Sequence, residues 1–181
     1  QEDRSPKVQA VRQEIEADPD LLTAAHAHRG GESLNALCAR FAHASSSVSA
    51  AVTLLANDLR YRDTERILEL SAMTPGAVLS GRRAGVVPSA QDRAHEAELR
   101  AIHDAMLPNG LLGHDRLGRP ILYKHYGQVR IAGLTSRGIE LANLIRYNTY
   151  LCERTAAAMQ QRGKWVIIID MSGIGLSQVI A

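Results

Sequence analysis

Apolar residues recur every three or four positions through the first part of the chain, which is the spacing of one face of an α-helix. The residues that set this pattern are Val8, Val11, Ile15, Leu34, Leu37, Phe41, Val48, Ala51, Val52, Leu55 and Leu59. Asp18-Pro19 combines an N-cap residue with a proline at the first helical position, and Ser33 and Ser47 are placed to cap two further helices. We therefore predict a helical module over residues 1–74.

A segment rich in glycine, proline and arginine follows this helical pattern. Pro75-Gly76 interrupts the pattern, and residues 81–88 contain further glycines, arginines and a proline. This composition predicts a linker or insertion over residues 75–98. A charged helix is expected over residues 95–106, with Pro108-Asn109-Gly110 as its end.

The last part of the chain changes to a strand pattern. Residues 121–126 form a short run that stops at Gly127, and residues 165–170 form a second, more apolar run. Between them lies a helical stripe, with Gly163 as its stop: Leu141, Leu144, Ile145, Leu151, Cys152, Thr155 and Met159. A strand, a long helix and a second strand make a βαβ unit, whose strands lie parallel in one sheet. The predicted fold class is α/β, with a helical module followed by the first βαβ part of an α/β domain over residues 99–181.

The pleat of the first strand divides its side chains between two faces of the sheet. One face receives Ile121, Tyr123 and His125, and the other receives Leu122, Lys124 and Tyr126. Both faces are partly apolar, which is typical of a strand covered on both sides in a parallel sheet.

Composition and charge narrow the class of function. The 21 basic and 19 acidic side chains leave a formal net charge of +2, and no dense Lys/Arg block occurs, so general nucleic-acid binding is disfavoured. Cys38 and Cys152 lie in apolar helical patterns without CxxC spacing, which indicates reduced packing residues of a cytosolic protein. The chain begins at Gln1 and ends on the apolar, uncapped Val179-Ile180-Ala181, so we expect a fragment of a longer protein.

No motif marks a catalytic, metal or cofactor site. The phosphate-binding pattern G-x-x-x-x-G-K-[ST] is absent, and Gly173-Ile174-Gly175 resembles a dinucleotide fingerprint whose third glycine position holds Gln178. His26 and His28 lie two positions apart on a helix and so do not share a face. Asp170 is interpreted as a side chain that binds loop N–H groups, with a metal or ribose ligand as the alternative. We predict no enzyme activity, no metal and no cofactor.

Three separated pieces of sequence together resemble the CRAL-TRIO lipid-binding family. The turn Gly113-x-Asp115-x-x-Gly118-Arg119-Pro120 leads into a strand, and Ile168-Ile169-Asp170-Met171-x-Gly173 follows the long helix. Upstream, Leu37-x-x-Arg40-Phe41 and the helix end Leu59-Arg60-Tyr61-Arg62 look like the family's N-terminal helical module. The family includes the phosphatidylinositol/phosphatidylcholine transfer proteins of the secretory pathway, and the resemblance covers about residues 34–181 apart from the linker.

The resemblance implies a sheet that forms the floor of a hydrophobic pocket for one lipid, with a mobile helix as its gate. A buried lipid tail contributes about 0.8 kcal/mol per CH₂ removed from water, which is enough for a protein cavity to compete with a membrane. Gly118 and Pro120 are expected to shape the turn, and Arg119 to hydrogen-bond a carbonyl group or the carboxylate of Asp115. The gate and the other headgroup contacts are expected beyond Ala181.

Six residues are assigned to the lipid by this resemblance, three on each predicted strand. They are Leu122, Lys124, Tyr126, Trp165, Ile167 and Ile169. The opposite face of the two strands is the competing assignment, and ordinary core packing against helices is a third interpretation.

Lipid transfer is the function that the resemblance implies. The protein would bind a phospholipid such as phosphatidylinositol and transfer or present it between membranes, as a cytoplasmic monomer with transient contact to membrane surfaces. Two alternatives remain open. One is a regulatory interaction domain that keeps the fold without moving lipid, and the other is an α/β enzyme that uses a nucleotide at residues 173–175.

Overall fold

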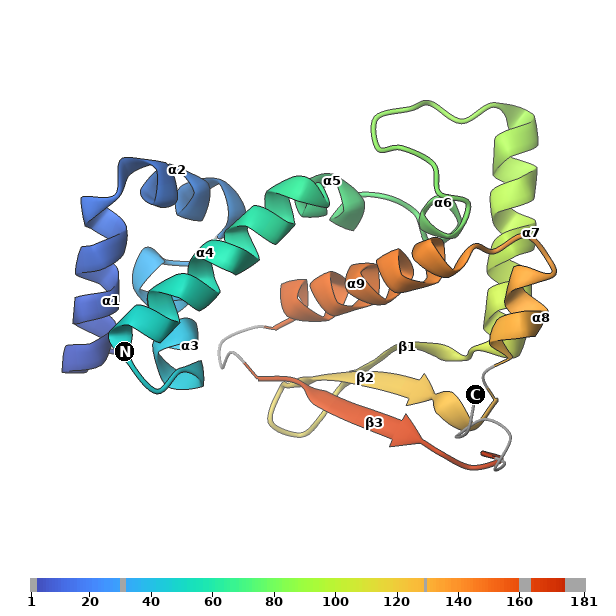
Figure 1. The fold of residues 1–181 in the computed structure, drawn as a ribbon. Helices are drawn as coiled ribbons and strands as arrows, with labels where there is room; N and C mark the ends of the chain where they lie inside the picture. Colours follow the sequence, from blue (N-terminus) through green and yellow to red (C-terminus); the bar gives the residue numbers. More distant parts are fainter. Residues whose placement is uncertain (1–2, 30–31, 129, 160–163, 175–181) are drawn as a thin grey trace. The chain divides into compact units, whose positions relative to one another are not determined.

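The chain divides into two compact units, Gln1–Leu68 and Glu69–Ala181 (Figure 1). The computed structural model describes residues 3–29, 32–128, 130–159 and 164–174. In this described part the first unit consists of helices, and the second combines helices with a three-stranded sheet. The predicted α/β class is therefore confirmed.

The first unit is built on the helices α1 (Pro6–Ala17), α2 (Pro19–His28), α3 (Leu34–Ala44) and α4 (Val48–Thr64). The side chains of Asp18, Ser33 and Ser47 accept hydrogen bonds from backbone N–H groups in the first turns of α2, α3 and α4, which confirms the three predicted N-caps. Helix α1 packs against α3 and α4. Most of the predicted apolar residues lie in their shared core, with Ile15 and Leu55 fully buried, and Phe41, Val48 and Val52 are partly buried against it.

The second unit starts within α5 (Ile67–Ser71) and continues through α6 (Pro75–Leu79), α7 (Ala90–Met106), α8 (Ile131–Thr135) and α9 (Leu141–Ala157). Residues 75–98, predicted as a linker or insertion, contain α6 and the start of α7. Helix α6 packs against α7 and α9, and a Cβ atom on Gly76 would overlap the backbone of Glu96. Helix α7 begins ahead of its predicted start because Ser89 and Asp92 form a capping box.

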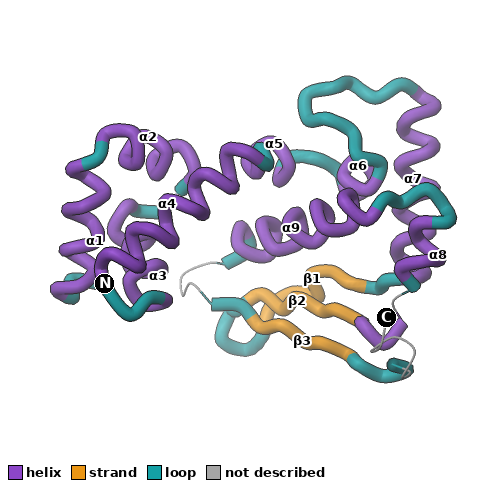
Figure 2. Tube along the Cα trace, viewed as in Figure 1, coloured by secondary structure: helices purple, strands orange, loops and turns teal. Residues whose placement is uncertain are grey.

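The sheet has the order β1 (Asn109–His114), β2 (Pro120–His125), β3 (Val166–Asp170) (Figure 2). Strands β2 and β3 are parallel neighbours, with Ile121 opposite Val166, which confirms the predicted pairing. Helix α7 ends at Met106, just before Pro108-Asn109-Gly110 as predicted. Strand β1, which follows and pairs antiparallel with β2, is not among the predicted elements. The connection between β2 and β3 also differs from one long helix, because α8 and a turn precede α9.

Helix α9 buries a different set of residues from the predicted stripe. Leu144, Leu151 and Thr155 are buried as expected, whereas Leu141 and Ile145 are 55% and 61% exposed. Tyr147 and Tyr150 are buried instead, and the Tyr147 ring packs edge-to-face on His103 of α7 with centroids 4.4 Å apart. The helix therefore packs on α7 as well as on the sheet, which a single stripe does not describe. The predicted stop at Gly163 lies outside the described residues.

Candidate functional site

The turn between β1 and β2 is held by Asp115. Its carboxylate accepts hydrogen bonds from the backbone N–H groups of Leu117 and Arg119, both at 2.9 Å, and from Arg119 Nε at 2.7 Å. The side-chain and backbone hydrogen bonds of Arg119 lower the pKa of Asp115. Gly118 has φ +73°, a backbone conformation that favours glycine. The predicted partnership of Arg119 with Asp115 is confirmed, and the turn has a structural role.

Helix α9 covers one face of β2. Leu122 is fully buried, Lys124 is 7% exposed, and Lys124 Nζ donates a hydrogen bond to Asn148 Oδ1 of α9 at 2.6 Å. In the parallel register Leu122 lies opposite Ile167 and Lys124 lies opposite Ile169. These four residues therefore share the α9-side face of the sheet, because paired residues of neighbouring strands point the same way.

Strand β3 is much more exposed than β2. Ile167 and Ile168 are each 43% exposed, and Ile169 is 50% exposed. Trp165 lies just before β3 and is half-buried. Tyr126 lies beyond β2 in the 3₁₀ helix η1 (Tyr126–Gln128), with its ring centroid 6.0 Å from Lys124 Nζ. Of the six predicted lipid residues, Leu122 and Lys124 are thus covered on β2, and Ile167 and Ile169 are exposed on β3. Tyr126, which is 39% exposed, and the half-buried Trp165 lie just outside the two strands.

The opposite face of the sheet carries a second row of apolar side chains. Ile121 and Tyr123 of β2 and Val166 of β3 are half-buried, and Ile168 is the exposed member of the row. Helix α9 packs against β1 and β2 from the other side, as the burial of Leu122 demonstrates. This face matches the competing assignment left open by the sequence.

A polar cluster joins the ends of β2 and β3 on that opposite face. Tyr123 OH donates to Asp170 Oδ2 at 3.0 Å, the Ser172 N–H donates to Asp170 Oδ1 at 2.8 Å, and Ser172 Oγ lies 3.2 Å from His125 Nε2. Hydrogen bonds from Ser172 and then from Tyr123 lower the pKa of Asp170 to about 2. A Cβ atom on Gly127 would overlap the Ser172 carbonyl oxygen, so the two strand ends touch through their backbones.

The geometry of this cluster favours a structural role. Asp170 Oδ2 lies 3.8 Å from the same His125 Nε2 that faces Ser172 Oγ, so the carboxylate does not orient the imidazole from its other nitrogen as in a catalytic triad. Both Asp170 oxygens are engaged within the cluster. The sequence placed Asp170 correctly at a strand end but did not connect it with His125. The parallel pairing of these two positions is the signal that could have done so.

An open groove of about 730 Å³ lies between α7, α9 and β1. Arg100 in its wall donates from Nε to Asp104 Oδ2 at 2.7 Å and from Nη1 to Tyr147 OH at 3.1 Å. Burial raises the pKa of Tyr147 to about 12, so its hydroxyl stays protonated at neutral pH. None of the six predicted lipid residues lines this groove. Apart from this charge pair, the lining includes apolar side chains such as Leu111, Leu112 and Leu151, so the groove is of mixed character.

Comparison with known protein families supports a lipid module over an unrelated α/β unit for the last part of the chain. Residues 104–181 match the CRAL/TRIO domain. The match covers β1, β2, α8, α9 and β3, and it supports the CRAL-TRIO family and a lipophilic ligand for this part of the chain. None of the curated proteins matches the chain.

Among the described residues, no helix combines the length and apolar character that crossing a membrane requires. The same part of the chain contains no group of three or more His, Cys, Asp or Glu side chains positioned to hold a metal ion.

Proposed function

We propose that this protein binds a phospholipid such as phosphatidylinositol and transfers or presents it between membranes, as a cytoplasmic monomer that contacts membranes transiently. The match of residues 104–181 to the CRAL/TRIO domain carries the proposal. The exposed isoleucines of β3 support it, because a lipid tail that covers apolar surface gains about 25 cal/mol of binding free energy per Å² removed from water. This function needs no bond to be made or broken, so the protein acts as a carrier and not as an enzyme.

The lipid tail lies on the sheet face opposite α9 in this proposal. Leu122 and Lys124 are covered by α9, so a ligand reaches them only if that helix moves. Ile121, Tyr123 and Ile168 on the other face have surface left to bury. On β2 this difference in exposure supports the competing assignment, whereas on β3 Ile167 and Ile169 are at least as exposed as Ile168 and exposure does not separate the two faces.

Two neighbouring isoleucines provide a matched test of the lipid and of its face. Ile167 and Ile168 are equally exposed at 43% and point to opposite faces of β3. Because a carboxylate is strongly disfavoured inside an apolar pocket, Ile168→Asp should lower the transfer of labelled phosphatidylinositol between vesicles at least tenfold. Ile167→Asp should leave transfer near that of the wild type.

The other outcomes of this experiment are equally informative. A loss confined to Ile167→Asp would assign the lipid to the α9-side face. If both variants transfer lipid as well as the wild type, the sheet is not the lipid floor. A wild-type protein that binds no lipid and transfers none would favour a regulatory interaction domain.

A nucleotide-using enzyme is the remaining alternative. Both oxygens of Asp170 are already engaged by Tyr123 and Ser172, which argues against a ribose or metal ligand at this position. We expect a titration with nucleotides to show no binding. Saturable nucleotide binding that Asp170→Asn abolishes would favour the enzyme.

A further inference from the structure

The connection between α6 and α7 carries two adjacent exposed apolar residues, Val86 and Val87. It arches away from both helices (Figure 1), and within it Val87 is 87% exposed and Val86 is 51% exposed. Single exposed apolar residues are common on protein surfaces and need no explanation. Two adjacent exposed valines in a projecting loop, here called the apolar tip, form a small apolar surface that a partner can cover.

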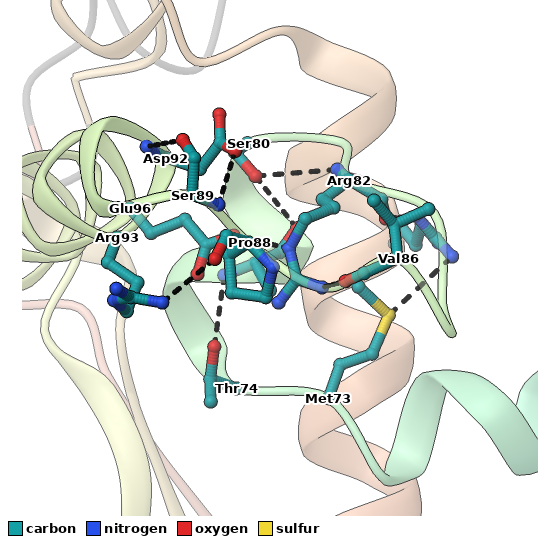
Figure 3. A network of polar contacts seen from close by, with 12 residues as sticks. Met73, Thr74, Ser80, Arg82, Val86, Pro88, Ser89, Asp92, Arg93 and Glu96 are labelled. Carbon is teal, nitrogen blue, oxygen red and sulfur yellow. Dashed lines mark hydrogen bonds and ion pairs between the residues drawn. The ribbon is translucent and has the colours of Figure 1, made fainter.

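Side-chain contacts hold this loop in one shape (Figure 3). Arg82 Nε donates to Glu96 Oε1 of α7 at 2.5 Å, and the two side chains are only 18% and 10% exposed. Arg146 of α9 donates from Nη1 to the carbonyl oxygen of Arg82 at 3.2 Å. Contacts to two long helices therefore present the valines on a braced loop, which reduces the ordering cost of binding.

The carbonyl groups on either side of Val87 are paired. Arg82 Nη1 donates to the carbonyl oxygen of Val86, and Arg93 Nη1 donates to that of Pro88 at 2.8 Å. Pro88 has no N–H group to satisfy. An unpaired backbone polar group is costly in an apolar medium, so this pairing makes it easier for the tip to enter the edge of a bilayer.

The charged side chains of the loop are all positive. Between Leu79 and Asp92 the chain contains two arginines, Arg82 and Arg83, and no acidic residue. Arg82 is paired with Glu96, whereas Arg83 is exposed and forms no ion pair within the described part of the chain. An unpaired guanidinium beside an apolar tip complements anionic lipid headgroups above an apolar layer.

We infer that this loop docks the protein on an anionic bilayer, with Val86 and Val87 entering the interface and Arg83 facing the headgroups. The inference rests on the proposed function, because a carrier has to contact a bilayer in order to load and release lipid. It assigns membrane contact to a surface separate from the β2–β3 sheet. A docking protein would fit the valines equally well but would not depend on anionic lipid.

Vesicle flotation tests this inference, with vesicles of phosphatidylcholine prepared with and without phosphatidylserine. The double variant Val86→Asp/Val87→Asp should bind phosphatidylserine vesicles at least tenfold more weakly than the wild type. Arg83→Gln should weaken binding roughly fivefold and lower its salt dependence. The matched control is Leu117→Asp, which changes a 59% exposed leucine in the β1–β2 turn and should bind like the wild type.

A second variant, which is read out by a gain of fluorescence signal, tests the inference even if the double variant misfolds. Val87→Trp should add a blue shift in fluorescence when phosphatidylserine vesicles are mixed in, compared with the wild type, whose single tryptophan is Trp165. Equal vesicle binding by the double variant and the wild type would overturn the inference, as would an unshifted Val87→Trp spectrum. Lipid bound in solution, measured without vesicles by extraction and mass spectrometry, reports the proposed function separately. The double variant should keep that lipid.

Discussion

The helical core of the first unit and strand β3 of the second unit use their apolar side chains in opposite ways. In Gln1–Leu68, the helices α1, α3 and α4 enclose a core in which Val8, Val11, Ile15 and Leu55 have no exposed surface. In Glu69–Ala181, strand β3 leaves Ile167, Ile168 and Ile169 between 43% and 50% exposed, although β2 beside it carries the fully buried Leu122. The core of the first unit buries its apolar side chains on folding, whereas β3 leaves apolar side chains uncovered.

This difference indicates where binding can still bury apolar side chains and so gain free energy. Full burial of a large aliphatic side chain contributes about 1.5–3 kcal/mol, so a half-exposed isoleucine has realised only part of that amount. The remainder is available to whatever covers β3. Whatever packs on β3 can therefore gain part of this free energy, whereas the closed core of the first unit has none left to gain.

The largest expected effect is the loss of a core side chain in the first unit. Leu55→Ala removes a fully buried side chain and should lower the free energy of unfolding by about 2–5 kcal/mol. Leu54→Ala is the matched control on the same helix, and because Leu54 is 45% exposed it should cost about 1 kcal/mol or less. Urea denaturation followed by far-UV circular dichroism measures both. Equal costs for the two variants would contradict the closed core.

A somewhat smaller effect is expected where the ends of β2 and β3 touch. Gly127→Ala places a Cβ atom on the Ser172 carbonyl oxygen and should destabilise the second unit by about 1–3 kcal/mol. Gly110→Ala is the control, since a Cβ atom there meets nothing within 4 Å. The fluorescence of Trp165, the single tryptophan, reports the transition of this unit. Equal stability of the two variants would mean that β3 is not held by this backbone contact.

The helices of the first unit could be predicted because their signals are local. Ser33 and Ser47 stand next to the N–H groups that they cap, and residues such as Ile15 mark a face within a few turns. Strand β1 has no such signal. Gly110 and Gly113 and a register shift after Leu111 hide its period, and it is a strand because β2 pairs with it.

The candidate site could be predicted only as far as the pairing of its strands. The apolar runs on β2 and β3 indicated two parallel neighbours, which the register of Ile121 with Val166 confirms. The covered face could not be predicted, because both faces of β2 carry apolar side chains. The covered face is determined by helix α9, which is separated from β2 in the sequence and contacts it through pairs such as Lys124 and Asn148.

A third effect, of about 1 kcal/mol, is expected for an exposed residue of β3. Ile169→Thr keeps a β-branched side chain and changes a residue that is 50% exposed, so the unliganded protein should lose little stability. Urea denaturation followed through Trp165 measures the change. A cost as large as that of Leu55→Ala would show that β3 is buried in solution, and the contrast between the two units would then fail.

The smallest expected effect is a dependence of stability on pH at the ends of β2 and β3. Because the pKa of Asp170 is lowered to about 2 from 3.8, its carboxylate contributes stability that is fully present above pH 4 and is lost as the pH falls through about 2. The group is at the surface, where solvent screens its interactions, so the loss should be modest. Asp170→Asn should reduce the fall in the urea midpoint of the Trp165 transition between neutral pH and pH 2. Part of this fall should remain in the variant, because the pKa of Asp115 is also lowered. An unchanged pH dependence in Asp170→Asn would show that the cluster does not hold the strand ends through its charge.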